Sequence, residues 1–134
     1  MNQKERISYI KYRLEKAKET FEVAELLIKN EKWNSAINRL YYSAYYAVSA
    51  LLVQATINTK THSGVKTQFF LHYIKTGIID VELGKVYADL FDWRHKGDYG
   101  DFFDFTAEDV LSIKQPTKEL LNNIEEVILN VLEP

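Results

Sequence analysis

Residues 33–55 read WNSAINRLYYSAYYAVSALLVQA, a stretch whose apolar residues cover most of the surface that a helix would present. They recur at alternating steps of four and three, which is the period of an α-helix. The stripe consists of Ile37, Tyr41, Ala44, Val48, Leu51 and Ala55, and Leu40, Ala47 and Leu52 widen it. A helix this apolar is buried on more than one side, so we expect it at the centre of a helical bundle. Asn34 or Ser35 can cap its start.

Helices with one apolar stripe each are predicted before and after this central helix. The first stripe consists of Ile7, Ile10, Leu14, Ala17, Phe21, Ala24 and Ile28. The last stripe consists of Val110, Ile113, Leu120, Ile124, Val127 and Val131. Thr106 and Asp109 resemble a capping box at the start of the last helix. We expect Pro116 to kink or divide that helix, because proline has no N–H group to donate.

Two further helices are predicted between them. The third is expected over residues 63–76 and should end at Gly77, where a left-handed residue is favoured. Asp80 can cap the fourth, which should fray near Gly97. If the chain turns sharply there, we expect Gly97 or Gly100 to take a positive φ.

Together these patterns predict an all-α antiparallel up-and-down bundle of four to five helices. No segment shows the alternation of a strand between turn signals, and the chain has no internal repeat. We expect one helical domain over residues 1–134.

Composition excludes several classes of site. The sequence has 46% hydrophobic residues and no cysteine, which excludes disulfides, thiol catalysis and cysteine-based zinc sites. Because no apolar run would span a bilayer or form a signal peptide, we expect a cytoplasmic protein with no membrane partner. Net charge is +2 in residues 1–32, +4 in the acid-free residues 33–79 and −8 in residues 80–134. Such segregation allows nucleic-acid binding, or simply packing of oppositely charged segments.

Four of the nine tyrosines stand in residues 39–46, RLYYSAYY. Tyr41 belongs to the apolar stripe, whereas Tyr42 and Tyr46 fall outside it, in line with Asn38. Because tyrosine joins a large apolar ring to one polar end, these side chains suit a dimer interface or a stacking surface. The alternative is a core helix whose tyrosines bond to neighbouring helices. The wide apolar helix and its tyrosines predict a two-fold homodimer.

The histidines show no metal-binding pattern. His62 is expected to cap or pack at a helix start, and His72 to be half-buried. The Glu-x-x-His pattern of metal sites in helical bundles does not occur, nor do the glycine-rich nucleotide loops. We expect neither a metal nor an organic cofactor.

The candidate site lies in residues 91–105, FDWRHKGDYGDFFDF. Arg94 and Asp98 are four residues apart and share a face if the helix continues that far. The planar guanidinium of Arg94 suits a carboxylate or a phosphate. Either it binds a ligand, or it pairs with Asp98 or Asp101 and shapes the loop.

Three segments taken together, RLYYSAYYAVSALL, THSGVKTQFFLHYIKTGIID and ELGKVYADLFDWRHKGDY, resemble the HEPN family of small helical proteins. The resemblance covers nearly the whole chain and implies a helical bundle that forms a symmetric dimer. Many HEPN members are toxins encoded beside a minimal nucleotidyltransferase antitoxin, and many are metal-independent ribonucleases. In these enzymes RNA is cut through attack by its own 2′-hydroxyl at the dimer cleft.

The family motif is an arginine followed, after four to six residues, by a histidine. Arg94 matches the arginine, but Asp98, Tyr99, Gly100 and Asp101 follow where the histidine is expected. His95 is adjacent to Arg94 and points about 100° away from it on a helix. The resemblance therefore implies a site that lacks the usual general acid/base.

In the first interpretation, the protein binds RNA, a nucleotide or a nucleotidyltransferase partner, and cleavage is slow or absent. Arg94 and Lys96 then contact the anion, because both carry a positive charge. The residues assigned to binding are Arg94, Lys96, Asn38, Tyr42 and Tyr46.

In the second interpretation, the protein is an active ribonuclease toxin with an altered arrangement. Its candidate catalytic residues are Arg94, His95, Asp98 and Tyr99. A third interpretation is a protein-interaction module without a nucleic-acid role.

Overall fold

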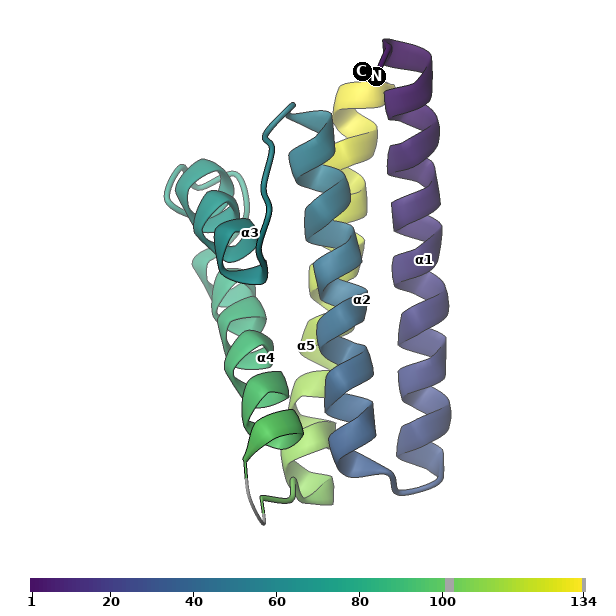
Figure 1. Cartoon of the computed structure of the whole chain (residues 1–134), viewed down its shortest axis with the longest axis vertical. Helices are drawn as coiled ribbons and strands as arrows, with labels where there is room; N and C mark the ends of the chain where they lie inside the picture. Colours follow the sequence, from purple (N-terminus) through teal and green to yellow (C-terminus); the bar gives the residue numbers. More distant parts are fainter. Residues whose placement is uncertain (101–102, 134) are drawn as a thin grey trace.

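The computed structural model describes residues 1–100 and 103–133. Its elements are α1 (Gln3–Lys29), α2 (Trp33–Gln54), α3 (His62–Phe69), the short π-helix η1 (Phe70–Ile74), α4 (Val81–Tyr99) and α5 (Ala107–Leu132). These two ranges contain no strand, and the predicted all-α bundle is confirmed. The four long helices alternate in direction, and both termini lie at the same end of the bundle (Figure 1).

α2 is the central helix, as its sequence predicts, and it contacts α1, α3, α4 and α5. Its buried residues are Ala36, Ile37, Leu40, Tyr41, Ser43, Ala44, Ala47, Val48, Ala50, Leu51 and Leu52. The polar Ser43 is tolerated there because its hydroxyl donates to the carbonyl oxygen of Leu40 at 2.7 Å. Burial of each large apolar side chain contributes roughly 1.5–3 kcal/mol, so this helix organises the core.

α5 differs in two ways from its prediction. The helix continues through Pro116, so the expected division is wrong. In the turn that contains the proline, the Thr117 hydroxyl donates to the carbonyl oxygen of Ile113 at 2.7 Å. The buried stripe then ends on Ile128, whereas Val131 is 61% exposed. The step of four residues from Ile124 to Ile128 is closer to the helical period of 3.6 than the predicted step of three from Ile124 to Val127.

The starts of the helices match their capping residues with one exception. Asp80 caps α4, and Thr106 forms the predicted capping box with Asp109 at the start of α5. Neither Asn34 nor Ser35 caps α2, which begins at Trp33 without a side-chain cap. Asn34 already lies inside the helix, and its side chain is free for a distant segment.

The third helix is shorter than predicted and changes type. Thr61 caps α3 by accepting from the backbone N–H of Gly64 at 2.9 Å. The α-helical turns end at Phe69, and the wider turn of η1 continues the segment to Ile74. Gly77 follows with a φ of +78°, which confirms the predicted left-handed residue.

Gly97 and Gly100 are needed for space and not for a left-handed backbone. α4 continues past Gly97 to Tyr99, so the prediction of fraying at Gly97 is wrong. The sharp turn on which a positive φ at Gly97 or Gly100 depended does not form, and among the described residues Gly77 is the only glycine with a positive φ. A Cβ at Gly97 would lie 2.9 Å from the ring of buried Phe105, and one at Gly100 would lie 2.5 Å from the carbonyl oxygen of Lys96. A side chain at either position would therefore collide with its surroundings.

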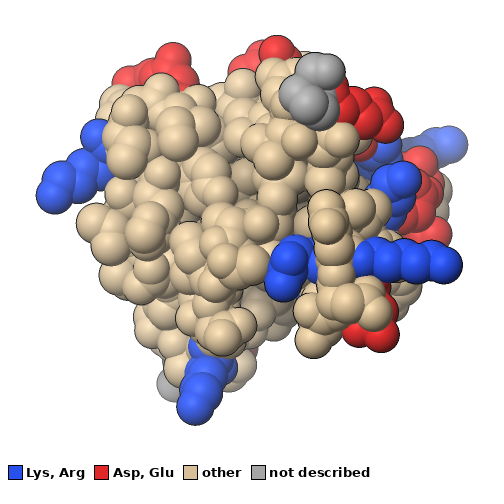
Figure 2. All heavy atoms as spheres, turned by 90° about the horizontal axis from the view of Figure 1, so that it is seen from above, with Lys and Arg blue, Asp and Glu red and all other residues tan. Residues whose placement is uncertain are grey.

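Charged side chains are unevenly spread over the surface. Figure 2 looks onto the end of the bundle that carries the termini, and most of this face is uncharged. Lysine, arginine, aspartate and glutamate gather at its margin on the side of α1, at the right in both views. Within the described part of the chain, none of the helices is both long and apolar enough to cross a membrane.

Candidate functional site

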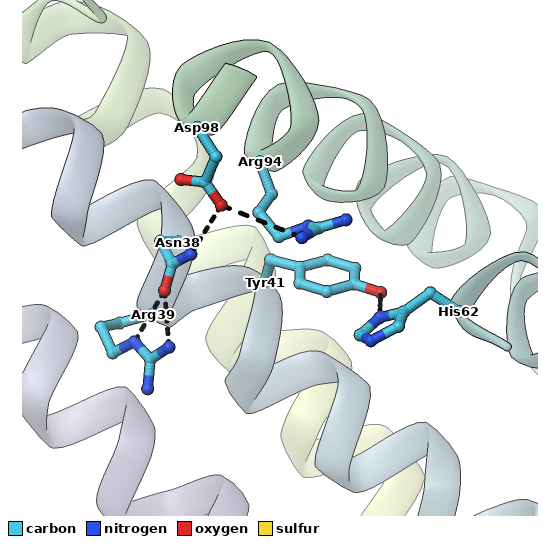
Figure 3. A network of polar contacts seen from close by, with 6 residues as sticks. All are labelled: Asn38, Arg39, Tyr41, His62, Arg94 and Asp98. Carbon is cyan, nitrogen blue, oxygen red and sulfur yellow. Dashed lines mark hydrogen bonds and ion pairs between the residues drawn. The ribbon is translucent and has the colours of Figure 1, made fainter.

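Arg94 lies flat against the central helix. Its guanidinium carbon is 5.0 Å from the centroid of the Tyr41 ring (Figure 3) and 5.9 Å from that of Tyr42. The negative faces of these rings attract the cation, and the attraction is stronger where water is excluded. The Arg94 side chain is 13% exposed, and its buried Nε has no acceptor among the described residues. The packing on two tyrosines therefore fixes the orientation of the guanidinium.

The predicted pair of Arg94 and Asp98 forms, but it is loose. The distance from Nη1 of Arg94 to Oδ2 of Asp98 is 3.8 Å. The same oxygen of Asp98 accepts a shorter bond from Nδ2 of Asn38, at 2.9 Å. Asn38 in turn accepts from Nε of Arg39 at 2.9 Å. Asp98 is thus held mainly by Asn38, and Asp101, the other expected partner, lies outside the described residues.

His62 lies at the hydroxyl end of the same tyrosine. The Tyr41 hydroxyl is 2.7 Å from Nδ1 of His62 (Figure 3), and the imidazole stacks on Tyr45 at a centroid distance of 4.4 Å. Burial lowers the pKa of His62, and the positive charge of Arg94 lowers it further. Burial raises the pKa of Tyr41 to about 12. At neutral pH, His62 is therefore uncharged and Tyr41 keeps its proton.

His62 is the residue of this site that sequence reasoning did not assign to it. Packing of His62 was expected, and the stacking on Tyr45 confirms it, whereas the capping role belongs to Thr61. His62 stands at the start of α3 and Arg94 in the second half of α4, and both meet the Tyr41 ring on α2. No local sequence pattern links these positions.

Arginines from other helices also lie on the tyrosine rings. Arg39 of α2 lies over Tyr42 at 4.9 Å, and Arg13 of α1 lies over Tyr46 at 5.5 Å. Tyr42 and Tyr46 are half-buried, as is Asn38. The tyrosines predicted to form an interface are thus partly covered by cationic side chains of the same chain. Their role as a dimer interface stays a prediction.

His95, Lys96 and Tyr99 lie around a different space. Together with Phe91, Asp92 and Gly100 they line an open pocket of about 650 Å³. The rings of His95 and Tyr99 are 5.0 Å apart, and Tyr99 is 68% exposed. Arg94 is not among the lining residues. The structure thus groups Arg94, Asp98 and Asn38 in one network beside Tyr42, and it places His95, Lys96 and Tyr99 around a separate pocket.

The chemistry offered at Arg94 is that of an anion site. Two nitrogen-bearing side chains, Arg94 and His62, meet at Tyr41, and Lys66 stands nearby with its ammonium 4.7 Å from the Phe91 ring centroid. Guanidinium and imidazole groups are donors that suit phosphate oxygens. In residues 1–100 and 103–133, no three histidines or carboxylates come together as metal ligands would.

Comparison with known proteins identifies the family of the chain. A sequence model of the HEPN domain matches residues 10–128. The chain belongs to the HEPN family. This HEPN match includes all of α2, α3 and α4, and hence every residue of the Arg94 network.

Three relatives match most of this HEPN chain. A "UPF0332 protein" of Thermotoga maritima is 41% identical over 96% of this chain and 96% of its own length. A protein named "Putative toxin MJ0142", from Methanocaldococcus jannaschii, is 38% identical over 87% of this chain and 74% of its own length. A second protein of that organism, "Putative toxin MJ0605", is 28% identical over 89% of this chain and 88% of its own length.

The imidazole that packs beside Arg94 in this HEPN protein comes from outside the family motif. Asp98 stands four residues after Arg94 and is bound to Asn38. His95, which follows Arg94 directly, lines the separate pocket. His62, by contrast, reaches the Tyr41 ring on which the guanidinium lies. The site therefore combines an arginine and a histidine that the family spacing does not connect.

Proposed function

We propose that this HEPN protein is the toxin-like component of a two-gene pair and binds phosphate groups of RNA or of a nucleotide in the cytoplasm. The observation that carries the proposal is the state of Arg94. Its guanidinium is held flat on Tyr41 and Tyr42, while its ionic partner Asp98 is bound more closely by Asn38. An oriented guanidinium whose carboxylate partner is engaged elsewhere is well prepared for a phosphate.

The surroundings of Arg94 support a nucleic-acid ligand. Arg39 and Arg13 lie on neighbouring tyrosine rings, and residues 33–79 contain four basic and no acidic side chains. Proteins that bind single-stranded nucleic acids combine such cations with aromatic rings on which bases stack. The names of the two Methanocaldococcus relatives support the toxin-like role.

We propose further that the protein acts as a two-fold dimer and pairs with a minimal nucleotidyltransferase. The half-buried Tyr42 and Tyr46 support a contact surface, since tyrosine is enriched where protein surfaces meet. A two-fold axis would place two Arg94 sites in one assembly.

A second candidate function is an active ribonuclease. The contact between the rings of His95 and Tyr99 in one open pocket favours it, because both side chains can exchange protons with a ligand there. Binding without cleavage remains the leading proposal, since Arg94 does not line that pocket.

The test of the leading proposal is a binding measurement. Fluorescence anisotropy with a labelled single-stranded oligouridylate at low salt should show binding by the parent protein. Arg94→Ala should bind at least about tenfold more weakly, since a charge-assisted bond is lost. Arg94→Lys should bind weakly as well, because lysine lacks the planar fork.

Lys85→Ala is the matched control. Lys85 is an exposed cation on the same helix, near its start, so the variant removes an equal charge outside the site. Equal losses in Arg94→Ala and Lys85→Ala would show that only net charge matters. Full binding by Arg94→Ala would mean that Arg94 is a structural partner of Asp98.

A further inference from the structure

The pairing of His62 with Tyr41 uses one nitrogen of the imidazole. Nδ1 of His62 lies 2.7 Å from the Tyr41 hydroxyl, so a ligand can reach only the other ring nitrogen, Nε2. The ring stacks on Tyr45 at a centroid distance of 4.4 Å and an interplanar angle of 19°. Because His62 is half-buried, bonded to Tyr41 at Nδ1 and stacked on Tyr45, its Nε2 has a defined direction.

The chemistry of the pair decides which nitrogen carries the proton. Tyr41 keeps its hydroxyl proton at neutral pH, and the neighbouring Tyr87 hydroxyl acts on Tyr41 as a donor and not as an acceptor. The remaining acceptor for the Tyr41 proton is Nδ1 of neutral His62. A neutral imidazole that accepts at Nδ1 carries its own proton on Nε2. Nε2 of His62 is therefore a donor, and it suits an anionic oxygen.

Arg94 provides a second donor at the same tyrosine. Arg94 covers the face of the Tyr41 ring to whose hydroxyl His62 is bonded, and its charge acts on His62. In Figure 3 the guanidinium end of Arg94 extends along the Tyr41 ring toward the hydroxyl and His62. Lys66 adds a second cation near Tyr41, because the Phe91 ring beneath its ammonium also contacts Tyr41.

We propose that Nε2 of His62 and the guanidinium of Arg94 bind one phosphate group together, as the anion subsite of this protein. The ligand is a phosphodiester of RNA or the phosphate of a free nucleotide. The inference rests on the proposed function and adds to it a residue from a different helix. Tyr41 is a positioning residue, because its hydroxyl orients the imidazole of His62.

The pH dependence of binding follows from the groups around His62. Tyr41, Tyr42 and Tyr45 face it from α2, and Arg94 faces it from α4. In the free protein this uncharged and cationic environment favours the neutral imidazole. A bound phosphate favours the charged form, so ligand binding should raise the pKa of His62 and should strengthen as the pH falls.

The experiment uses two probes, a labelled oligouridylate and uridine 5′-monophosphate, with the full chain. His62→Ala should bind at least one of them about tenfold more weakly, as expected for loss of a bond to a charged group. His62→Gln should retain part of the binding, since its amide can donate from a similar place, but should lose the pH dependence. Tyr41→Phe keeps the buried ring and should weaken binding several-fold. His72→Ala, at an exposed histidine, is the control and should bind as the parent does.

The two probes separate the sources of the phosphate. Weaker binding of the oligonucleotide alone assigns a phosphodiester, weaker binding of uridine 5′-monophosphate alone assigns a terminal phosphate, and weaker binding of both shows that the subsite accepts either. NMR of imidazole-labelled protein should show a proton on Nε2 of His62 and a rise in its pKa when uridine 5′-monophosphate is added.

The outcomes distinguish this inference from the proposed function. If Arg94→Ala loses RNA binding while His62→Ala and Tyr41→Phe, both folded by circular dichroism, bind as tightly as the parent, the His62 subsite is refuted and the function stands. An unchanged pKa of His62 in the presence of bound nucleotide refutes it as well. If the parent binds neither probe, both proposals fail.

Discussion

The side chain of Asn34 holds the backbone of Phe105. Its Oδ1 accepts from the N–H of Phe105 at 2.8 Å, and its Nδ2 donates to the carbonyl oxygen of Phe103 at 3.0 Å. The side chain of this residue in the first turn of α2 thus provides hydrogen-bond partners for two backbone groups of the segment that leads into α5. The ring of Phe105 is then placed against Gly97 and Trp93 of α4.

Replacement of Asn34 by alanine should destabilise the domain by about 1–3 kcal/mol, because the partly buried N–H of Phe105 loses its acceptor. Urea denaturation measures the change in the free energy of unfolding. Asn34→Asp keeps an acceptor and should lose less. Ser35→Ala, at the exposed neighbouring position, is the control and should change stability little. Equal stability of Asn34→Ala and Ser35→Ala would contradict the role of Asn34.

Replacement of Gly97 by valine should destabilise the protein by about 1–3 kcal/mol, as overpacking typically does. The added Cβ would lie 2.9 Å from the Phe105 ring. The same change in a Phe105→Ala background should cost less, because the collision is then removed. Additive losses of stability in the double variant would show that Gly97 and Phe105 do not interact.

In solution the protein should be a two-fold dimer. Light scattering coupled to gel filtration at micromolar concentration should give twice the 15.7 kDa mass of one chain. Tyr46→Glu should weaken the dimer, because a charge would enter the expected contact surface. A single species of 15.7 kDa for the parent would rule the dimer out.

Cleavage of RNA by the purified protein should be slow or absent. His95 and Tyr99 line a pocket that does not include Arg94, and Asp98 is bound by Asn38. None of the three therefore takes the place of the family's histidine beside Arg94. The assay compares the parent with Arg94→Ala and His95→Ala. Robust cleavage that both variants lose would make His95 catalytic and would refute the incomplete site.

The stability of the fold should depend on pH through His62. Burial, with Arg94, lowers the pKa of His62 below its ordinary 6.5 in the folded protein. The unfolded chain therefore takes up this proton at a higher pH, so the free energy of unfolding should decrease as the pH falls through about 6.5.

His62→Gln should remove this part of the pH dependence. Urea denaturation of parent and variant at about pH 5 and pH 7.5 brackets the ordinary histidine pKa. A difference between the two proteins that is the same at both pH values would mean that His62 does not titrate differently on folding.

The helices could be predicted from the sequence because their signals are local. The stripe around Tyr41 and Val48 has the helical period, and burial follows from it. The Thr106–Asp109 capping box and the left-handed Gly77 depend only on residues a few positions away in the sequence. Asn34 misled the prediction, since an asparagine near a helix start resembles a cap and its actual partners lie far along the chain.

The site was only partly predictable. The spacing of Arg94 and Asp98 places them on one face, but it does not reveal that Asn38 takes the carboxylate. The position of His62 depends on the path of the chain between α2 and α3, which no periodicity describes. Contacts between distant segments are set by tertiary packing, and no local pattern in a single sequence predicts them.

The packing of Trp93 on Phe105, at a centroid distance of 5.5 Å, gives the molecule a built-in optical reporter. The chain has two tryptophans, and the other, Trp33, is the residue before Asn34. Both indoles thus belong to the end of the bundle remote from the termini (Figure 1). Intrinsic fluorescence will therefore report loosening of the end that Asn34 holds earlier than loosening of the end that carries the termini. A lag between the fluorescence and circular dichroism signals during unfolding would show which end opens first.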